Sequence, residues 1–208
     1  WFGYWLGDGS NNKRLVYLSG GYNKEWWFDE YDDLVYYLFD RKNTLYYSKR
    51  RSSIAERSFG FVGLTKWLES DCRDSNRDKT VPFWILERAT DDELEEFLIG
   101  LFRTDGHLAK KLAVVSSSNY SISCAIFYSM LRIGFIPNIY INTYENNKRI
   151  IVGNECNVKS NWQFAISGKT CRDFINKTFY SDVDFGFGIN KSCYSDDNFI
   201  YVKVKNLL

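Results

Sequence analysis

Two spacings of apolar residues occur along this chain, and together they predict its elements. Helical spacing predicts helices over residues 1–8, 25–40, 61–68, 91–104, 118–133 and 170–179. Alternating or short apolar runs predict strands over residues 14–18, 44–49, 112–116, 139–143, 149–152 and 164–167, and the fourth and fifth of these strands are expected to form a hairpin. The order of helix, strand, helix, strands and helix predicts an α+β fold with an antiparallel sheet in each half.

Residues 70–79 are polar and charged and mark the clearest change of composition in the chain. They predict a surface linker between a first half, residues 1–78, and a second half, residues 79–182. An antiparallel sheet covered by helices on one face leaves its other face free. Two such sheets side by side would form a saddle whose width could suit the major groove of DNA, about 12 Å across.

Two nonamers that begin 97 residues apart share one pattern. The first runs from Trp1 to Gly9 and reads WFGYWLGDG, and the second runs from Leu98 to Gly106 and reads LIGLFRTDG. Each is an apolar run with Gly at its third position and Asp-Gly at its end. The repetition predicts two copies of one unit, packed so that their aspartates meet. Two carboxylates at one point are what a divalent metal site needs.

Small residues lie one helical turn apart in each nonamer, at Gly3 and Gly7 in the first and at Gly100 and Thr104 in the second. Such residues allow two helix backbones to approach closely. The spacing therefore predicts a pair of helices in direct contact along these four positions.

Gly9 and Gly106 follow the two aspartates and are typical of helix C-termini at which the chain takes a positive φ. Each acid would then lie where the helix dipole disfavours negative charge, and a bound cation would relieve that conflict. One such nonamer alone would instead indicate a buried helix with a capping Asp-Gly. Neither run approaches the roughly 20 apolar residues that a membrane-spanning helix needs.

The nonamers resemble the motif after which the LAGLIDADG homing endonucleases are named, with the acids at the eighth position. Other segments are similar to the intein-embedded branch, which includes the endonucleases of the yeast vacuolar-ATPase intein and of yeast mating-type switching. These segments are residues 79–85, 116–135, 165–168, 185–189 and 195–200. The last two resemble the beginning of an intein's C-terminal splicing segment, to which residues 183–208 are assigned. The remaining splicing parts are expected outside this sequence, which by itself could not splice.

The resemblance implies a monomer with internal pseudo-two-fold symmetry that cuts both strands of double-stranded DNA by metal-dependent hydrolysis. Asp8 and Asp105 would bind divalent cations, with Mg²⁺ as the expected ion, and would form the catalytic pair. Lys79 would assist water activation or stabilise transition-state charge, the alternative being an exposed lysine before a proline turn. Lys177 would be its counterpart in the second half, with Lys169 as the next candidate.

Basic residues cluster beside the predicted strands and turns, where they could contact phosphates or could simply be solvated loop charge. The clusters assigned to DNA binding are Lys13 and Arg14, Lys49 with Arg50 and Arg51, and Lys148 with Arg149. Residues 138–152 would form a ribbon whose polar side chains reach base edges, or a plain surface hairpin. His107 could be a general base or a ligand, or a partly buried polar residue on the strand after the second nonamer.

The formal net charge is only +1, so the total charge does not indicate a nucleic-acid-binding protein. A DNA enzyme with separate acidic and basic faces would also have a net charge near zero. Five scattered cysteines without a Cys-x-x-Cys pair indicate reduced thiols in an intracellular protein, of the nucleus or cytoplasm. No run of residues predicts a membrane span or a secretory signal. Two other functions stay open: a DNA-binding protein with decayed catalysis, and an inert insert of an intein.

Overall fold

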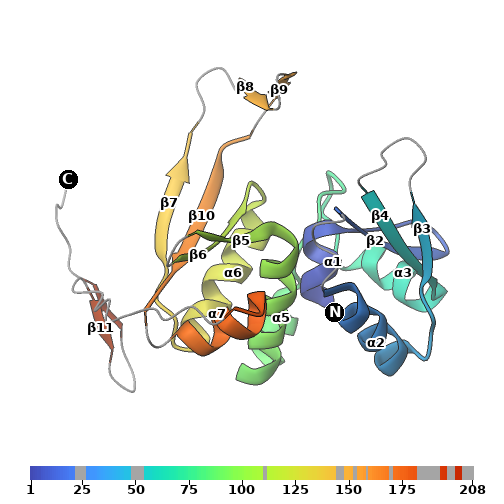
Figure 1. Ribbon diagram of the computed structural model, residues 1–208, viewed down its shortest axis with the longest axis horizontal. Helices are drawn as coiled ribbons and strands as arrows, with labels where there is room; N and C mark the ends of the chain where they lie inside the picture. The colour runs from blue at the N-terminus through green and yellow to red at the C-terminus, as the bar shows by residue number, and fades with distance from the viewer. Residues whose placement is uncertain are drawn as a thin grey trace.

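A central pair of helices divides the molecule into two halves (Figure 1). The pair consists of α1 (Phe2–Asp8) and α5 (Asp91–Asp105). The computed structural model describes residues 1–21, 27–47, 54–109, 112–143, 148–151, 154–157, 159–168, 171–181, 193–195 and 200–202, with backbone only for the described residues of 148–157 and 193–202. None of the helices in these ranges is long and apolar enough to cross a membrane.

The two halves repeat one order of elements. In the first half, α1 is followed by β1 (Gly9–Asn11), β2 (Leu15–Gly21), α2 (Phe28–Phe39), β3 (Thr44–Tyr47), β4 (Ile54–Gly60) and α3 (Val62–Ser70). In the second half, a short α4 (Phe83–Arg88) precedes α5, and then come β5 (Gly106–Ala109), β6 (Leu112–Ser117), α6 (Tyr120–Arg132), β7 (Asn138–Asn142), β10 (Asn161–Ile166) and α7 (Arg172–Phe179).

The two sheets are antiparallel and have the strand orders β1-β2-β4-β3 and β5-β6-β10-β7, which correspond strand by strand. The predicted α+β class with one antiparallel sheet per half is therefore confirmed. In each sheet, the edge strand nearest the centre begins directly after the helix of the central pair. The sheets consequently extend outward from the helix pair in opposite directions (Figure 1).

The predicted hairpin between residues 139–143 and 149–152 is wrong. Instead β7 pairs with β10, while β8 (Lys148–Ile151) pairs with β9 (Asn154–Asn157). The partner of β7 lies about 20 residues further along the chain, so no local turn signal could identify it. The sequence did not predict β9, nor did it predict β1, β4 and α4. β1 and α4 span only three and six residues, and the apolar positions of β4 are interrupted by charged residues.

Helix boundaries in the second half follow local capping chemistry. Asn119 is the N-cap of α6, and its side chain accepts a hydrogen bond from the backbone N–H of Ile122. The same helix stops before Gly134, whose φ of +81° a residue with a side chain rarely adopts. A capping box of Thr90 and Glu93, not predicted, begins α5.

Each sheet has one face packed on helices and one open face. The buried face carries residues such as Val16, which pairs with Phe59 in the first half, and Val115, which pairs with Phe164 in the second. The alternate positions therefore lie on the open face. By register these are Ser10, Leu15, Tyr17, Ser19, Gly21, Thr44, Tyr46, Ile54, Glu56, Ser58 and Gly60 in the first half, and His107, Ala109, Leu112, Val114, Ser116, Asn138, Tyr140, Asn142, Asn161, Gln163 and Ala165 in the second.

The contact between α1 and α5, here called the helix seam, has room only for small residues. A Cβ at Gly3 would lie 2.0 Å from the carbonyl oxygen of Phe97, and one at Gly100 would lie 2.9 Å from the backbone nitrogen of Tyr4. A Cβ at Gly7 would lie 2.0 Å from Oγ1 of Thr104. The backbones are thus close enough that any side chain at these glycines would collide with the facing helix.

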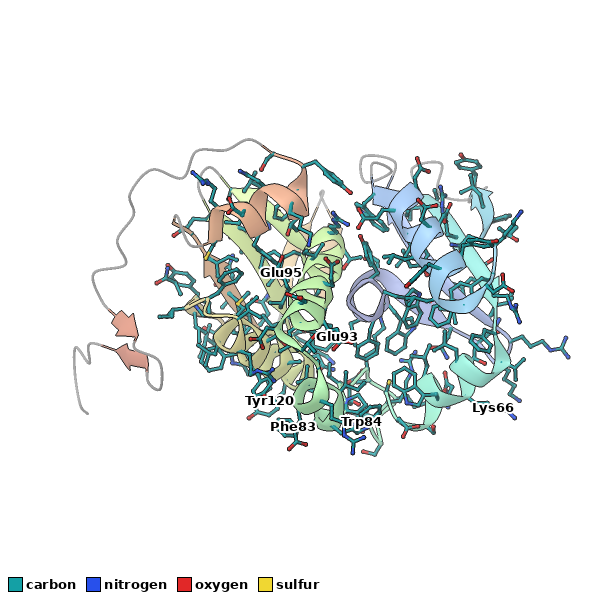
Figure 2. All side chains as sticks on the ribbon, turned by 90° about the horizontal axis from the view of Figure 1, so that it is seen from below. Lys66, Phe83, Trp84, Glu93, Glu95 and Tyr120 are labelled. Atoms are coloured by element: carbon teal, nitrogen blue, oxygen red, sulfur yellow. The ribbon has the colours of Figure 1, made fainter. Side chains whose placement is uncertain are left out.

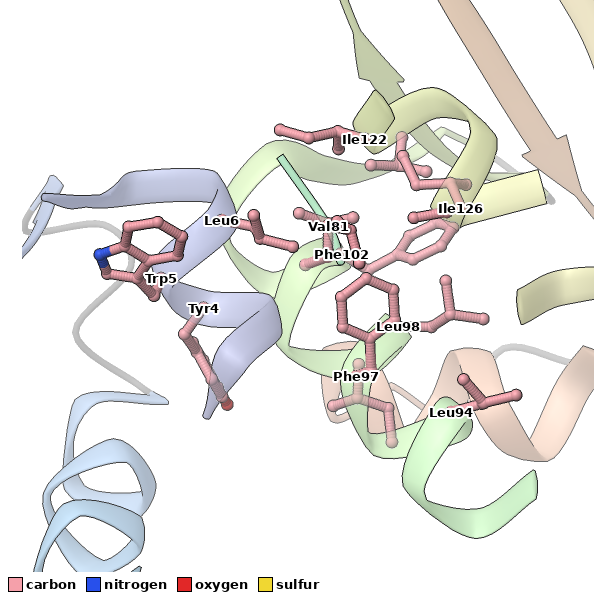
Figure 3. Close-up of a cluster of buried hydrophobic side chains, with 14 of the residues drawn as sticks. Tyr4, Trp5, Leu6, Val81, Leu94, Phe97, Leu98, Phe102, Ile122 and Ile126 are labelled. Carbon is pink, nitrogen blue, oxygen red and sulfur yellow. The ribbon is translucent and has the colours of Figure 1, made fainter. Parts of the chain in front are cut away.

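Larger residues beside the helix seam fill one hydrophobic core that continues across both halves. Figure 3 shows Tyr4 and Trp5 on the α1 side and Phe97 and Phe102 on the α5 side, with Leu6 pointing across toward Val81. All six residues are buried. Apolar burial and close backbone packing therefore hold the halves in one arrangement.

A buried arginine adds a polar contact between the halves. Arg103, on α5, is 3% exposed and donates to the hydroxyl of Tyr4 at 2.6 Å and to the carboxylate of Glu30 on α2. Its remaining donors reach the carbonyl oxygens of Thr178 and Lys177, at 3.0 and 3.1 Å. Because both helices of the central pair and α2 are tied to one guanidinium, the halves are also fixed in rotation about the seam.

The expectation of a positive φ at Gly9 and Gly106 is wrong, because their φ values are −80° and −91°. Glycine is needed there for space instead. A Cβ at Gly9 would lie 2.5 Å from Cα of Trp5, and one at Gly106 would lie 2.4 Å from the carbonyl oxygen of Phe102. The chain leaves each helix so sharply that the first strand residue touches the preceding helical turn.

The helix seam predicts a stability difference between two glycine-to-alanine variants. Gly3→Ala places a methyl group against the backbone of Phe97 and is expected to lower the free energy of unfolding by at least about 2 kcal/mol. Gly63→Ala, on α3, meets nothing closer than 3.6 Å and is expected to be neutral or to stabilise by up to about 1 kcal/mol. Urea denaturation of both variants measures this difference, and equal stabilities would contradict the close contact.

Candidate active site

The two aspartates of the nonamers lie at the same end of the helix seam. The helices run in the same direction, because Gly3 faces Phe97 and Leu101 while Gly7 faces Thr104. A Cβ at Gly7 would lie 3.3 Å from the carboxyl carbon of Asp105. Asp8 follows Gly7 directly and ends α1 as Asp105 ends α5.

Lys79 lies at the C-terminal end of α1, near these two acids. Its Nζ donates to the carbonyl oxygens of Trp5, Leu6 and Gly7, at 2.8, 2.9 and 3.1 Å. These are carbonyls of the last turn of α1, where helix carbonyls run out of N–H partners. The carbonyl of Trp5 also accepts from the backbone N–H of the C-cap residue Gly9. The ammonium group also lies 5.1 Å from the ring centre of Trp5. Lys79 therefore supplies positive charge at the negative end of the α1 dipole.

The charge of Lys79 is coupled to both aspartates. Burial lowers its pKa to about 8, while the carboxylate of Asp105 acts in the opposite direction, Arg73 lowers the pKa further and Asp8 raises it. An ammonium with a pKa of about 8 is still mostly charged at pH 7. Asp8, Asp105 and Lys79 thus form one electrostatic cluster at the end of the seam.

The backbone beside Lys79 is attached to the second half. The side-chain amide of Asn119 donates to the carbonyl of Lys79 at 2.8 Å, and the hydroxyl of Ser121 accepts from the N–H of Val81 at 3.1 Å. Lys79 therefore extends from an anchor on α6 to the end of α1. The loop that the sequence indicated as a plain linker holds one charged group of the site in place.

No pattern in the sequence indicated a role for Arg73, and none indicated the hydrogen bond by which Asn119 holds the backbone of Lys79. The guanidinium of Arg73 lies 5.6 Å from the ring centre of Trp5, and its chain forms an isolated antiparallel bridge with Lys79. Its position six residues before Lys79 in the polar segment carried no distinguishing pattern. Only the fold of the loop brings Arg73 to the site.

The structure does not bring Lys177 to the two aspartates. Lys177 lies on α7 and donates to the carboxylate of Glu96 at 2.6 Å. Glu96 precedes Asp105 by nine residues on α5, which separates them by roughly 14 Å along the helix axis. Lys169 lies outside the described residues. In the order of elements, the loop after α7 corresponds to the loop after α3, which carries Lys79. Residues 182–192 of the loop after α7 also lie outside the described residues.

His107 lies on β5, two residues after Asp105, and is exposed rather than partly buried. It pairs with Val114 in the ladder, which puts it on the open face of the second sheet. Its position is therefore next to the aspartates, on the surface that a large ligand would approach.

The predicted DNA-binding residues divide into three groups. Lys13 and Arg14 are exposed in the turn between β1 and β2, which Asn12 shapes by accepting hydrogen bonds from the N–H groups of Arg14 and Leu15. Lys148 and Arg149 belong to β8, whose side chains are not described. Residues 49–51 lie outside the described residues.

The donor chemistry at the seam fits a divalent metal ion. Asp8 and Asp105 offer carboxylate oxygens, which hard cations such as Mg²⁺ and Ca²⁺ prefer. Within the described ranges no group of three His, Cys, Asp or Glu residues gathers as a metal site. A small divalent ion bound by one or two carboxylates completes its shell with water and phosphate oxygens. The two aspartates therefore suit an ion that is shared with a phosphate-bearing substrate.

Comparison with known proteins places this arrangement in a fold family. Residues 92–168 match the LAGLIDADG-like domain family. Mesophilic variants of the homing endonuclease I-DmoI give a TM-score of 0.57 at 14% identity, covering 88% of this chain and 94% of that chain. I-DmoI in complex with DNA and Ca gives a TM-score of 0.58 at 14% identity and covers 87% of each chain.

A variant of I-DmoI in complex with its target DNA in the presence of Mg gives a TM-score of 0.54 at 14% identity, covering 88% of this chain and 94% of that chain. No curated protein is similar enough in sequence to count as a match. The chain therefore has the two-halved fold of the LAGLIDADG homing endonucleases, and its second half carries a LAGLIDADG-like domain.

The electrostatic cluster predicts the titration of Lys79 in the metal-free protein. The ¹³Cε resonance of this lysine is expected to titrate near pH 8, and Asp105→Asn is expected to lower that pKa because it removes a charge that favours the ammonium. Lys79→Met identifies the resonance by its loss. A midpoint that Asp105→Asn leaves in place would contradict the coupling between these two groups.

Proposed function

We propose that this protein is a site-specific endonuclease that cuts both strands of double-stranded DNA. The observation that carries the proposal is the placement of Asp8 and Asp105, one from each pseudo-symmetric half, at one end of the helix seam beside Lys79. A pair of acids near a pseudo-two-fold axis gives each strand of a duplex an equivalent position. The fold shared with I-DmoI, which has been solved in complex with DNA and Ca, supports the same function.

The open faces of the two sheets suit a DNA duplex. They carry hydroxyl, amide, phenol and imidazole groups with one carboxylate, Glu56, besides apolar positions such as Leu15 and Leu112. Asn and Gln side chains can pair with the edge of adenine, and hydroxyl groups bond to bases or phosphates. The amides of this surface in the second half are Asn138, Asn142, Asn161 and Gln163, and the side chains of Asn142 and Asn161 are hydrogen-bonded at 2.9 Å.

Catalysis on this surface would combine a metal ion with the charges at the seam. Asp8 and Asp105 would hold divalent cations, for which Mg²⁺ is the ion we propose. A bound divalent ion supplies an activated water and neutralises charge on the leaving oxygen. Lys79, mostly protonated at pH 7, would stabilise negative charge on the phosphate rather than accept a proton. Its contacts with Trp5, Leu6 and Gly7 keep the ammonium in place before substrate binds.

The finer assignment follows from the resemblance in sequence. Residues 79–85 and 183–208 favour the intein-embedded branch of the family, with the last segment as the beginning of a splicing part. The pseudo-two-fold arrangement within one chain supports a monomeric enzyme, and an intracellular location agrees with the free thiols of Cys72 and Cys124. An inactive DNA-binding protein would retain the same saddle, but both acids are present here.

The proposed mechanism predicts separate effects on cleavage and on binding. Asp105→Asn is expected to reduce cleavage by at least about a hundredfold, because the amide binds a divalent cation far less well than a carboxylate. DNA affinity at the same salt concentration is expected to stay unchanged. Incubation of a randomised double-stranded DNA pool with Mg²⁺, followed by sequencing of the cut ends, gives the target and the rate.

Asp8→Asn is expected to give the same result, since the acids occupy equivalent positions. Asp92→Asn, in the first turn of α5, serves as the control and is expected to cleave normally. If Asp105→Asn cut both strands at the normal rate, the paired-acid mechanism would be wrong.

A further inference from the structure

An apolar groove of about 530 Å³ lies at the opposite end of the helix seam from the two aspartates. It is formed by α2, α4 and the N-terminal ends of α1 and α5. Its apolar lining includes Trp1, Leu34, Leu38, Trp84, Leu86 and Phe97. Glu93, on its wall, precedes Asp105 by twelve residues, so the groove and the candidate active site are roughly 18 Å apart along α5.

Large apolar side chains border this groove and are open to solvent. Leu38 is 51% exposed and Trp84 is 48% exposed. Figure 2 shows Trp84 and Glu93 on the side of the molecule that the helices cover, away from the open sheet faces. A concentrated apolar surface of this kind marks an interaction site more often than scattered single residues do.

The charges around the groove have one prevailing sign. Asp92, Glu93 and Glu96 line it, with Glu96 paired to Lys177, against Arg88 as its basic lining residue among the described residues. The first turn of α2 adds Asp29, while Glu30 beside it is paired with Arg103. The acidic excess at the groove therefore comes from Asp92, Glu93 and Asp29. DNA and anionic membrane surfaces would be repelled here. The charge therefore selects a ligand with basic groups beside its apolar ones.

We propose that this groove binds a basic amphipathic helix of a partner protein. Apolar side chains of such a helix, spaced by three or four residues, would enter between α2 and α5, as amphipathic helices do in other apolar grooves. Its lysine or arginine residues would then pair with Asp92 and Glu93. A second copy of this chain fits less well, because its own corresponding surface is acidic and like charges would face each other.

A designed peptide tests the proposal on the full chain. The probe is a fluorescein-labelled helix of about 18 residues with Leu on one face and Lys on the other. Fluorescence anisotropy is expected to show saturable binding, and Trp84→Ala is expected to weaken it at least about fivefold, as the loss of an anchor contact does. Tyr120→Ala, which removes an exposed aromatic ring on α6 outside the groove, is the matched control and is expected to bind normally.

Two further peptides isolate the amphipathic pattern and the charge. A scrambled peptide of the same composition, and one with Glu in place of Lys, are expected to bind at least about fivefold more weakly. Equal binding of either peptide, or unchanged binding to Trp84→Ala, would overturn the proposal. A concentration-dependent dimer that Trp84→Ala abolishes would also overturn it and would assign the groove to a second copy.

Because the peptide would bind far from Asp105, the binding measurement does not depend on nuclease activity. Asp105→Asn is expected to bind the peptide like the wild type, whatever its effect on cleavage. The two proposals can therefore fail separately.

Discussion

The structure depends on the direct contact of two helix backbones at the seam. Gly3 and Gly100 leave no side chain between α1 and α5 at their positions, so the facing backbones touch, and Gly7 lies against the small side chain of Thr104. Close packing of this kind has no slack, because a shift of either helix would meet hard-sphere repulsion on one side and lose contacts on the other. The relative position of the two halves, and with it the spacing of the two aspartates, follows from that constraint.

Placing two carboxylates at neighbouring helix C-termini is electrostatically unfavourable, and the chain offsets part of this cost with its own lysine. Lys79 donates to three α1 carbonyls while its backbone is anchored on α6, so one residue joins the two halves and neutralises charge between them. Burial and neighbouring charges hold its pKa near 8, which keeps the ammonium charged at neutral pH but easily influenced by what binds at Asp105.

The net charge is only +1, but surfaces of different chemistry lie at the two ends of the helix seam. The open faces of the sheets carry mostly neutral hydrogen-bonding groups, with Glu56 as a carboxylate among them, and lie at the same end of the seam as the acids. At the other end, an apolar groove is bordered by Asp92, Glu93 and Glu96. The near-neutral total therefore includes unlike regions. One fold can in this way present a surface for DNA and another for a basic protein segment without competition between them.

The sequence by itself determined the α+β class, the two nonamers, the small residues of the seam and most helices, because apolar periodicity records which side of an element faces a core. Tertiary structure alone decided the pairing of β7 with β10, the contact of Lys79 with the end of α1 and the placement of Lys177 beside Glu96. Each of these depends on which distant segments pack together, and residue spacing within a segment contains no information about its partner. The groove is of the same kind, since its walls come from four helices that only the folded chain brings together.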